Sequence, residues 1–102
     1  MRQIALIAVV AGLAWAPMSQ AQDVAKAEAT IKSSGCLKCH SVSADKDGPS
    51  FKKTAAKYKG KADGAAALQT GLTKGMMGKE KHAVLKGSPD DVKNVVSYIL
   101  SR

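Results

Sequence analysis

Four stretches of the chain have apolar residues three and four positions apart, the spacing that places them on one face of an α-helix. The segments 41–48 and 75–87 lie between these stretches, are polar or rich in glycine, and predict loops. The pattern therefore predicts an all-α domain without strands. The four helices are expected at residues 24–34, 49–59, 63–74 and 88–100.

Residues with capping tendencies mark where these helices begin and end. Asp23 and Asp63 are suitable N-caps for the first and third helices, and Pro49 suits the first turn of the second. Gly35 is expected to end the first helix, because glycine readily adopts the left-handed conformation found there. The last helix is the best marked, since Ser88 can cap it just ahead of a proline and two aspartates.

The N-terminal residues predict an export signal that is cleaved from the mature protein. Arg2 gives the start a positive charge, residues 4–15 are almost entirely apolar, and residues 19–21 resemble a cleavage site. The apolar run is shorter than the about 20 residues that span a bilayer. We therefore expect a signal peptide at 1–21, one mature domain at 22–102, and a periplasmic location without a stable membrane anchor.

The residues Cys36-Leu37-Lys38-Cys39-His40 form the pattern C-x-x-C-H, which is typical of covalent haem attachment. The two thiols would form thioethers with the porphyrin, and the adjacent histidine would ligate the iron. A haem would also supply the apolar core that so short a domain lacks. Three other interpretations remain open: a thioredoxin-like redox pair, a zinc site with His82 as a further ligand, and a simple disulfide.

With its motifs taken in order, the mature region resembles the small bacterial class I cytochromes c. The resemblance rests on the sequences GCLKCH at 35–40, GPSF at 48–51, AAKY at 55–58 and VVSYILS at 95–101. It implies about four helices around one covalently attached haem c, bound through Cys36 and Cys39, with His40 as the proximal iron ligand. It also implies that the Pro49 carbonyl orients the His40 ring, and that Tyr98 lies where the terminal helices cross.

The second axial ligand is expected on the segment before the last helix, which offers His82, Met77 and Met76. The family usually places a methionine about six residues before the cap of the last helix, in proline-rich surroundings. His82 lies six residues before Ser88, whereas Met77 and Met76 lie eleven and twelve before it, and residues 75–87 contain no proline. His82 is therefore the preferred ligand, Met77 the alternative and Met76 the less favoured one, with an open or labile site as a further option.

Filled axial positions leave no place for a substrate on the iron, so the resemblance implies a periplasmic electron carrier and not an enzyme. The chain would act as a monomer or as the small subunit of a redox complex. Two histidine ligands predict a relatively low reduction potential, and a histidine with a methionine predicts a higher one. The alternative is a haem-based sensor or gas-binding protein whose sixth ligand is labile.

The chain is basic, with 16 Lys and Arg against 8 Asp and Glu and a formal net charge of +8. Some of the lysines are expected to border the haem and to steer the protein toward acidic surfaces of redox partners. These are Lys38, Lys74, Lys79, Lys81 and Lys86. Export and an aromatic content of only 4% argue against nucleic acid as a partner.

Overall fold

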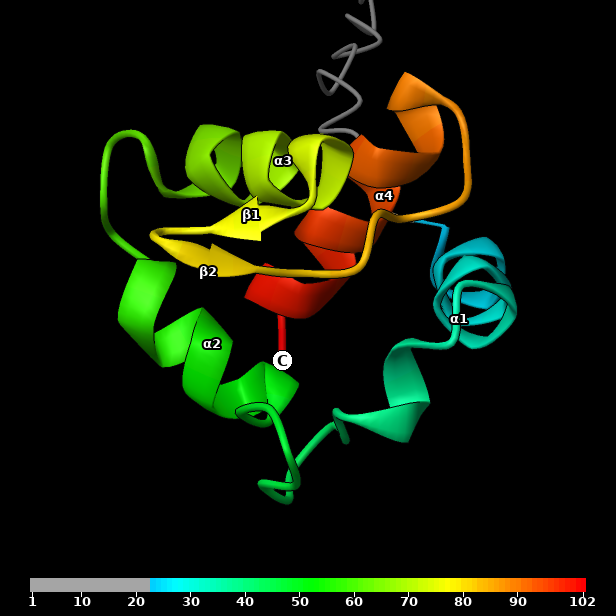
Figure 1. Ribbon diagram of the computed structural model, residues 1–102, viewed down its shortest axis with the longest axis horizontal. Helices are drawn as coiled ribbons and strands as arrows, with labels where there is room; N and C mark the ends of the chain where they lie inside the picture. Colours follow the sequence, from blue (N-terminus) through cyan, green and yellow to red (C-terminus); the bar gives the residue numbers. More distant parts are fainter. Residues whose placement is uncertain (1–22) are drawn as a thin grey trace, which may run out of the picture.

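A computed structural model describes residues 23–102, and the predicted signal peptide at 1–21 lies outside the described residues. Its helices are α1 (Val24–Ser33), α2 (Phe51–Tyr58), α3 (Gly64–Lys74) and α4 (Pro89–Leu100). The last helix is the common element, because α1, α2 and α3 each pack against α4 (Figure 1). The four predicted helices are confirmed. Within the described range, no helix combines the length and apolarity needed to cross a bilayer.

Side-chain caps fix the starts of α1 and α4. The Asp23 side chain accepts a hydrogen bond from the Lys26 amide at 3.0 Å. Ser88 Oγ accepts from the Asp91 amide at 3.2 Å, while the Asp91 carboxylate accepts from the Ser88 amide at 2.9 Å, which completes a capping box. Asn94 then joins the two helices by exchanging hydrogen bonds of 2.8 and 3.0 Å with the backbone of Asp23. The predicted caps Asp23 and Ser88 are confirmed.

Of the other two predicted helix starts, that of α2 is wrong, and that of α3 is right although its expected capping bond is absent. α2 begins at Phe51 and not at Pro49, because Ser50 is the N-cap and its Oγ accepts from the Lys53 amide at 3.0 Å. Pro49 thus precedes the cap, and its carbonyl is available to another partner. Asp63 occupies the N-cap position of α3, but its side chain makes no capping bond. Its φ of −108° and ψ of 9° are not the extended backbone that usually aims a capping side chain.

The expectation of no strands is also wrong, on a small scale. β1 (Met76–Met77) and β2 (Glu80–Lys81) form an antiparallel hairpin inside the predicted loop at 75–87. A 3₁₀ turn, η1 (Cys36–Lys38), follows α1 after Gly35, whose φ of +74° confirms it as the residue that ends the helix. Elements of two or three residues are too short to produce a periodic pattern. The all-α fold class stands, because the hairpin only braces a connection.

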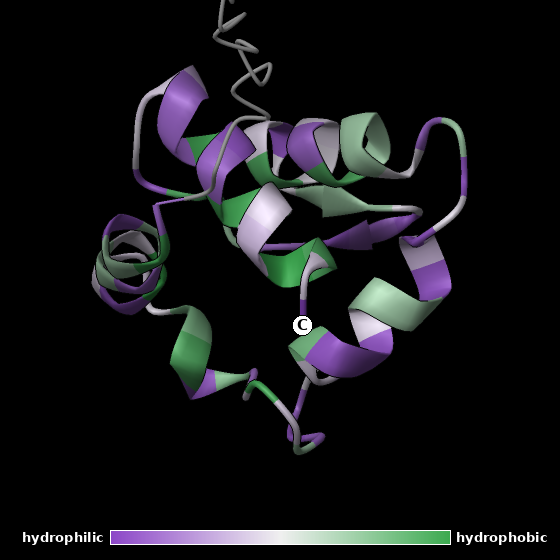
Figure 2. Cartoon of the chain, turned by 180° about the vertical axis from the view of Figure 1, so that it is seen from behind, coloured by the Kyte–Doolittle hydropathy of each residue, from purple (hydrophilic) through white to green (hydrophobic). Residues whose placement is uncertain are grey.

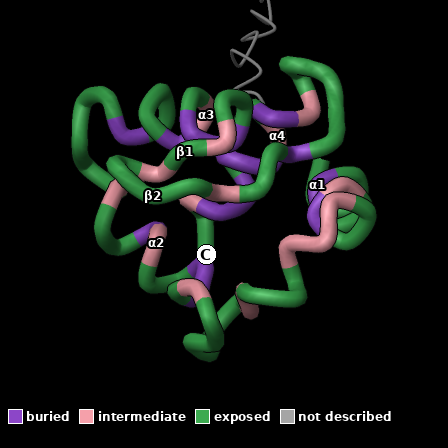
Figure 3. Tube along the Cα trace, in the orientation of Figure 1, coloured by how far each residue is buried: buried purple, intermediate pink, exposed green. Residues whose placement is uncertain are grey.

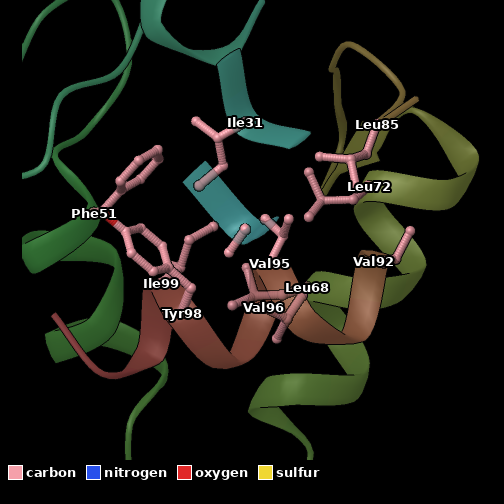
Figure 4. Close-up of a cluster of buried hydrophobic side chains, with 11 residues drawn as sticks. Ile31, Phe51, Leu68, Leu72, Leu85, Val92, Val95, Val96, Tyr98 and Ile99 are labelled. Atoms are coloured by element: carbon pink, nitrogen blue, oxygen red, sulfur yellow. The ribbon is translucent and has the colours of Figure 1, made fainter. Parts of the chain in front are cut away.

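The hydrophobic core lies between α4 and the helices around it (Figure 4). Tyr98 is only 3% exposed; its ring meets Phe51 edge-on at a centroid distance of 6.4 Å, and its hydroxyl donates to Glu28 of α1 at 3.4 Å. Tyr98 of α4 thus lies where this helix contacts α1, which is the position that the resemblance implies. Each helix carries both polar and apolar residues (Figure 2). The connection between η1 and α2 is largely exposed (Figure 3).

Candidate functional site

A cleft of about 880 Å³ is lined by residues from all four helices, from η1 and from the hairpin. Its volume lies within the range of about 300–1,000 Å³ that is usual for cofactor pockets. Its wall includes both cysteines and both histidines of the described chain. The apolar part of the wall is made by the core residues Ile31, Phe51, Leu68, Leu72, Val95 and Ile99. The cleft thus combines an apolar lining with thiol and imidazole groups.

The two cysteines are held by a tight turn. The Cys36 carbonyl accepts from the Cys39 amide at 3.2 Å and from the His40 amide at 3.0 Å. Cys36 is half-buried, Cys39 is exposed, and the thiols are not joined to each other. Burial raises the pKa of the Cys36 thiol, although a hydrogen bond with its own backbone acts in the opposite direction. The site of Cys36 therefore suits a neutral sulfur, such as a thioether, better than a thiolate.

The His40 ring is held by contacts with three neighbouring residues. Its Nδ1–H donates to the Pro49 carbonyl at 2.7 Å, the contact that the resemblance implies. Gly48 packs flat against the ring, since a Cβ at this position would lie only 2.8 Å from His40 Nδ1. Phe51 stacks beside it with ring centroids 5.7 Å apart. Because Nδ1 carries the proton, Nε2 has a free lone pair for a metal.

His82 is set by the backbone of its own loop. Its Nδ1–H donates to the Ala83 carbonyl at 2.7 Å, which again leaves the lone pair on Nε2. The His82 amide donates to the Gly75 carbonyl at 2.8 Å, and the Leu85 amide donates to Leu72 in α3 at 3.0 Å. These bonds attach the loop to the end of α3 at the histidine itself and three residues after it.

The two imidazoles line the same cleft, with ring centroids 5.9 Å apart and an interplanar angle of 34°. A metal ion ligated by two imidazoles, with metal–nitrogen bonds of about 2 Å, separates the ring centroids by roughly 6 Å. The spacing of His40 and His82 therefore fits an iron between them. The cysteines and the apolar wall fit a porphyrin around that iron.

The two methionines of β1 lie on opposite sides of the hairpin, as neighbouring strand residues do. Met77 is half-buried, lines the cleft and packs against the core. Its sulfur lies close to α3, where a Cβ at Gly71 would come within 2.6 Å of it. Met76 is 39% exposed and lines a separate shallow groove beside α3. Met77 thus packs between α3 and the cleft, whereas Met76 is not among the residues that line the cleft.

The described residues do not support a zinc site at the cysteines. Among residues 23–102, no three His, Cys, Asp or Glu side chains converge into a possible metal site. The two-stranded hairpin likewise lacks the strand–helix–strand surroundings of a thioredoxin-like redox pair. The haem interpretation alone uses the cysteines, the histidines and the apolar wall together.

Charged side chains at the cleft are only partly those that the sequence suggested. Lys79 and Lys81 line the cleft, as expected, but Lys74 lines the separate groove beside α3. Lys38 and Lys86 are exposed. Lys53 and Lys57 of α2 also line the cleft, which the sequence did not indicate because the tertiary approach of α2 decides it.

Helices packed on a C-terminal helix, around a cleft with a C-x-x-C-H turn in its wall, define the class I cytochrome c architecture. The comparison with known families agrees: the family model for cytochrome c matches residues 24–102. The chain therefore belongs to the cytochrome c family.

Individual relatives support the same grouping. The chain is 33% identical over 80 residues to cytochrome c-551 of Pseudomonas denitrificans, covering 72% of this chain and 94% of that protein. It is similar to the crystal structure of the class 1 cytochrome MtoD from Sideroxydans lithotrophicus ES-1, with 42% identity, a TM-score of 0.70, and coverage of 79% and 97% of the two chains. The structure of cytochrome c552 from Nitrosomonas europaea is 29% identical, with a TM-score of 0.59 and coverage of 72% and 96%.

These findings confirm the predicted fold class and cofactor. The chain is a small bacterial class I cytochrome c, and its family binds haem c covalently and carries electrons.

Proposed function

We propose that this chain is a periplasmic single-electron carrier whose haem is attached at Cys36 and Cys39 and ligated by His40 and His82. The observation that carries the proposal is the pair of imidazoles in the cleft. Their ring centroids lie 5.9 Å apart, and the Nδ1–H of each ring donates to a backbone carbonyl. When bound, the haem supplies a one-electron iron couple. His40 and His82 would both hold the iron, which would leave it no open position for a substrate.

The identity of the two iron ligands decides whether the reduction potential is relatively low or relatively high. An imidazole donates more strongly to ferric iron than a thioether does, so two histidines favour the oxidised state relative to a histidine–methionine pair. We therefore propose a lower potential than that of a methionine-ligated relative. Met77 remains the alternative ligand and Met76 the less favoured one; in the proposal both have packing roles.

The surroundings of the cleft suggest how the carrier meets its partners. Lys53, Lys57, Lys79 and Lys81 line the cleft, together with the carboxylates of Asp47 and Glu80. An excess of positive charge around the cleft would steer the protein onto an acidic surface of a redox protein, in a salt-dependent way. We propose a monomer, or the small subunit of a redox complex, that is exported by a signal peptide at 1–21 and mature from residue 22.

Two variants of the haem-loaded protein test the sixth ligand. His82→Ala is expected to lose the ferric spectrum of bis-imidazole iron, to raise the potential and to let the reduced protein bind carbon monoxide. Met77→Ala is the matched control: it should keep the wild-type spectrum and potential, with only a loss of stability. If His82→Ala keeps the wild-type spectrum while Met77→Ala changes it, the assignment of His82 is wrong.

A further inference from the structure

The peptide bond between Pro49 and Ser50 is hydrogen-bonded at both of its polar atoms. Its carbonyl oxygen accepts from His40 Nδ1–H at 2.7 Å. Its N–H group, which belongs to Ser50, donates to Asp45 Oδ1 at 2.8 Å. One planar, conjugated group therefore connects the imidazole of His40 to the carboxylate of Asp45.

The loop around this peptide is well fixed. The Gly48 amide donates to the Cys39 carbonyl at 2.7 Å, and the Phe51 amide donates to the Ser41 carbonyl at 2.9 Å. Ser50 itself is only 5% exposed, although the carboxylate that it meets lies at the surface. The geometry of the Pro49–Ser50 peptide is thus set by the backbone, and the carboxylate adds charge to a contact that is already in place.

Asp45 is charged at neutral pH. Its pKa lies below the ordinary value, mainly because the Ser50 amide donates to the carboxylate and also because Lys53 is near. The Lys53 Nζ lies 3.3 Å from Asp45 Oδ2, but the two side chains are 67% and 53% exposed, so this ion pair is solvated and weak. The bond from the Ser50 amide is shorter, at 2.8 Å, and its donor belongs to a nearly buried residue, so it is the better defined of the two contacts.

We propose that Asp45 is a positioning residue that tunes the iron ligand His40 through the Pro49–Ser50 peptide. Hydrogen bonds in a chain polarise one another, so a negative acceptor at the N–H end makes the carbonyl oxygen at the other end a better acceptor. A better acceptor draws the Nδ1 proton away from the ring and makes Nε2 a stronger donor to a metal. Stronger donation favours ferric iron, so Asp45 lowers the reduction potential.

The chain contains a matched control for this proposal. Asp47 is also exposed, carries the same charge in the same loop, and lines the cleft directly. A purely coulombic effect through space should therefore be at least as large for Asp47 as for Asp45. Only Asp45 has the contact with the Ser50 amide. Changing either residue to asparagine removes one negative charge, and an asparagine at 45 keeps an oxygen that can accept from Ser50.

The experiment compares Asp45→Asn and Asp47→Asn in the haem-loaded protein at low and high salt. We expect Asp45→Asn to increase the equilibrium constant for reduction about threefold, which is about 28 mV for a one-electron couple at 59 mV per tenfold. The NMR resonance of the His40 Nδ1 proton in the ferrous protein should move upfield. Asp47→Asn should shift the potential by less than half as much and leave that resonance in place. Salt should suppress most of the effect of Asp47→Asn but little of that of Asp45→Asn, because free ions screen a field through solvent more than a direct hydrogen bond.

Two results would overturn the proposal. Equal shifts of potential in both variants would mean that Asp45 acts only as a surface charge. A loss of stability in Asp45→Asn with an unchanged potential and proton resonance would mean that it acts only as a structural brace. The proposal uses His40 from the proposed function but not His82. A wrong assignment of His82 would appear in the His82→Ala spectra, and it leaves the comparison of the two aspartates intact.

Discussion

The two imidazoles at the cleft are held in contrasting ways. His40 donates to Pro49, nine residues further along the chain, across a loop closed by backbone hydrogen bonds. His82 donates to the carbonyl of the next residue, Ala83. The orientation of the first ring therefore depends on tertiary structure, and that of the second depends on the local backbone. We infer that substitutions near His40 reduce stability and haem content, whereas substitutions near His82 mainly shift the reduction potential.

The largest effect is expected from Gly48→Ala, on the His40 side. The added methyl group would overlap the imidazole ring, so the ring or the loop must move and the contact with Pro49 must weaken. Overpacking of this kind usually costs about 1–3 kcal/mol. The urea midpoint of the haem-loaded protein should be lower than that of the wild type. The ratio of haem absorbance to protein absorbance should also be lower.

Gly60→Ala provides the control for that variant. Gly60 has a φ of +84°, but a Cβ there would meet nothing within 4 Å. It should lose stability through backbone strain alone and keep full haem content. If Gly48→Ala retains its haem as fully as Gly60→Ala does, the His40 side is less constrained than we infer.

A smaller effect is expected from Gly75→Ala, on the His82 side. Gly75 has a φ of +76°, and a Cβ there would lie 2.9 Å from the His82 carbonyl oxygen. Gly78 has a φ of +60° and open space around it. Both substitutions should cost about 1–2 kcal/mol for the left-handed backbone. Gly75→Ala alone should also shift the potential in a redox titration, and equal potentials for the two variants would contradict a role of this contact in placing His82.

Ser88→Ala should have a smaller effect again, because it acts where the His82 loop joins α4. Loss of the capping bond to Asp91 should lower the free energy of unfolding by about 1 kcal/mol. The potential should not change, since the bonds of His82 and Leu85 to the end of α3 remain. A shifted reduction potential would show that the start of α4 also positions the imidazole ring of His82.

The smallest effect is a dependence of stability on acidic pH. The pKa of Asp91 is lowered mainly by the Ser88 amide, and that of Asp45 mainly by the Ser50 amide. A lowered pKa in the folded state means that each carboxylate stabilises the fold above its unfolded pKa of about 3.9, and that this contribution is lost as the pH falls through the folded value. Urea midpoints of wild type and Asp91→Asn should therefore differ most near neutral pH and converge in acid. A constant difference across this range would contradict the assigned cause.

Much of this architecture could be predicted because its signals are local. The caps Asp23 and Ser88 and the C-x-x-C-H turn each depend on residues within a few positions of one another. The positions of Lys53 and Lys57 at the cleft, and the link from Asp45 to the Pro49–Ser50 peptide, depend on how distant segments approach. The wrong start of α2 has a different origin, since Ser50 and not Pro49 provides the cap and this contact is local. A capping serine directly after the proline was the available local signal.

The paired hydrogen bonds between Asp23 and Asn94 have a practical consequence for engineering. They fix the start of α1 onto α4, and Asp23 is not among the residues that line the cleft. A linker attached just upstream of Asp23 would therefore leave from a firmly held point and need not cross the cysteines. This favours the start of α1 as the point for immobilising the protein on an electrode.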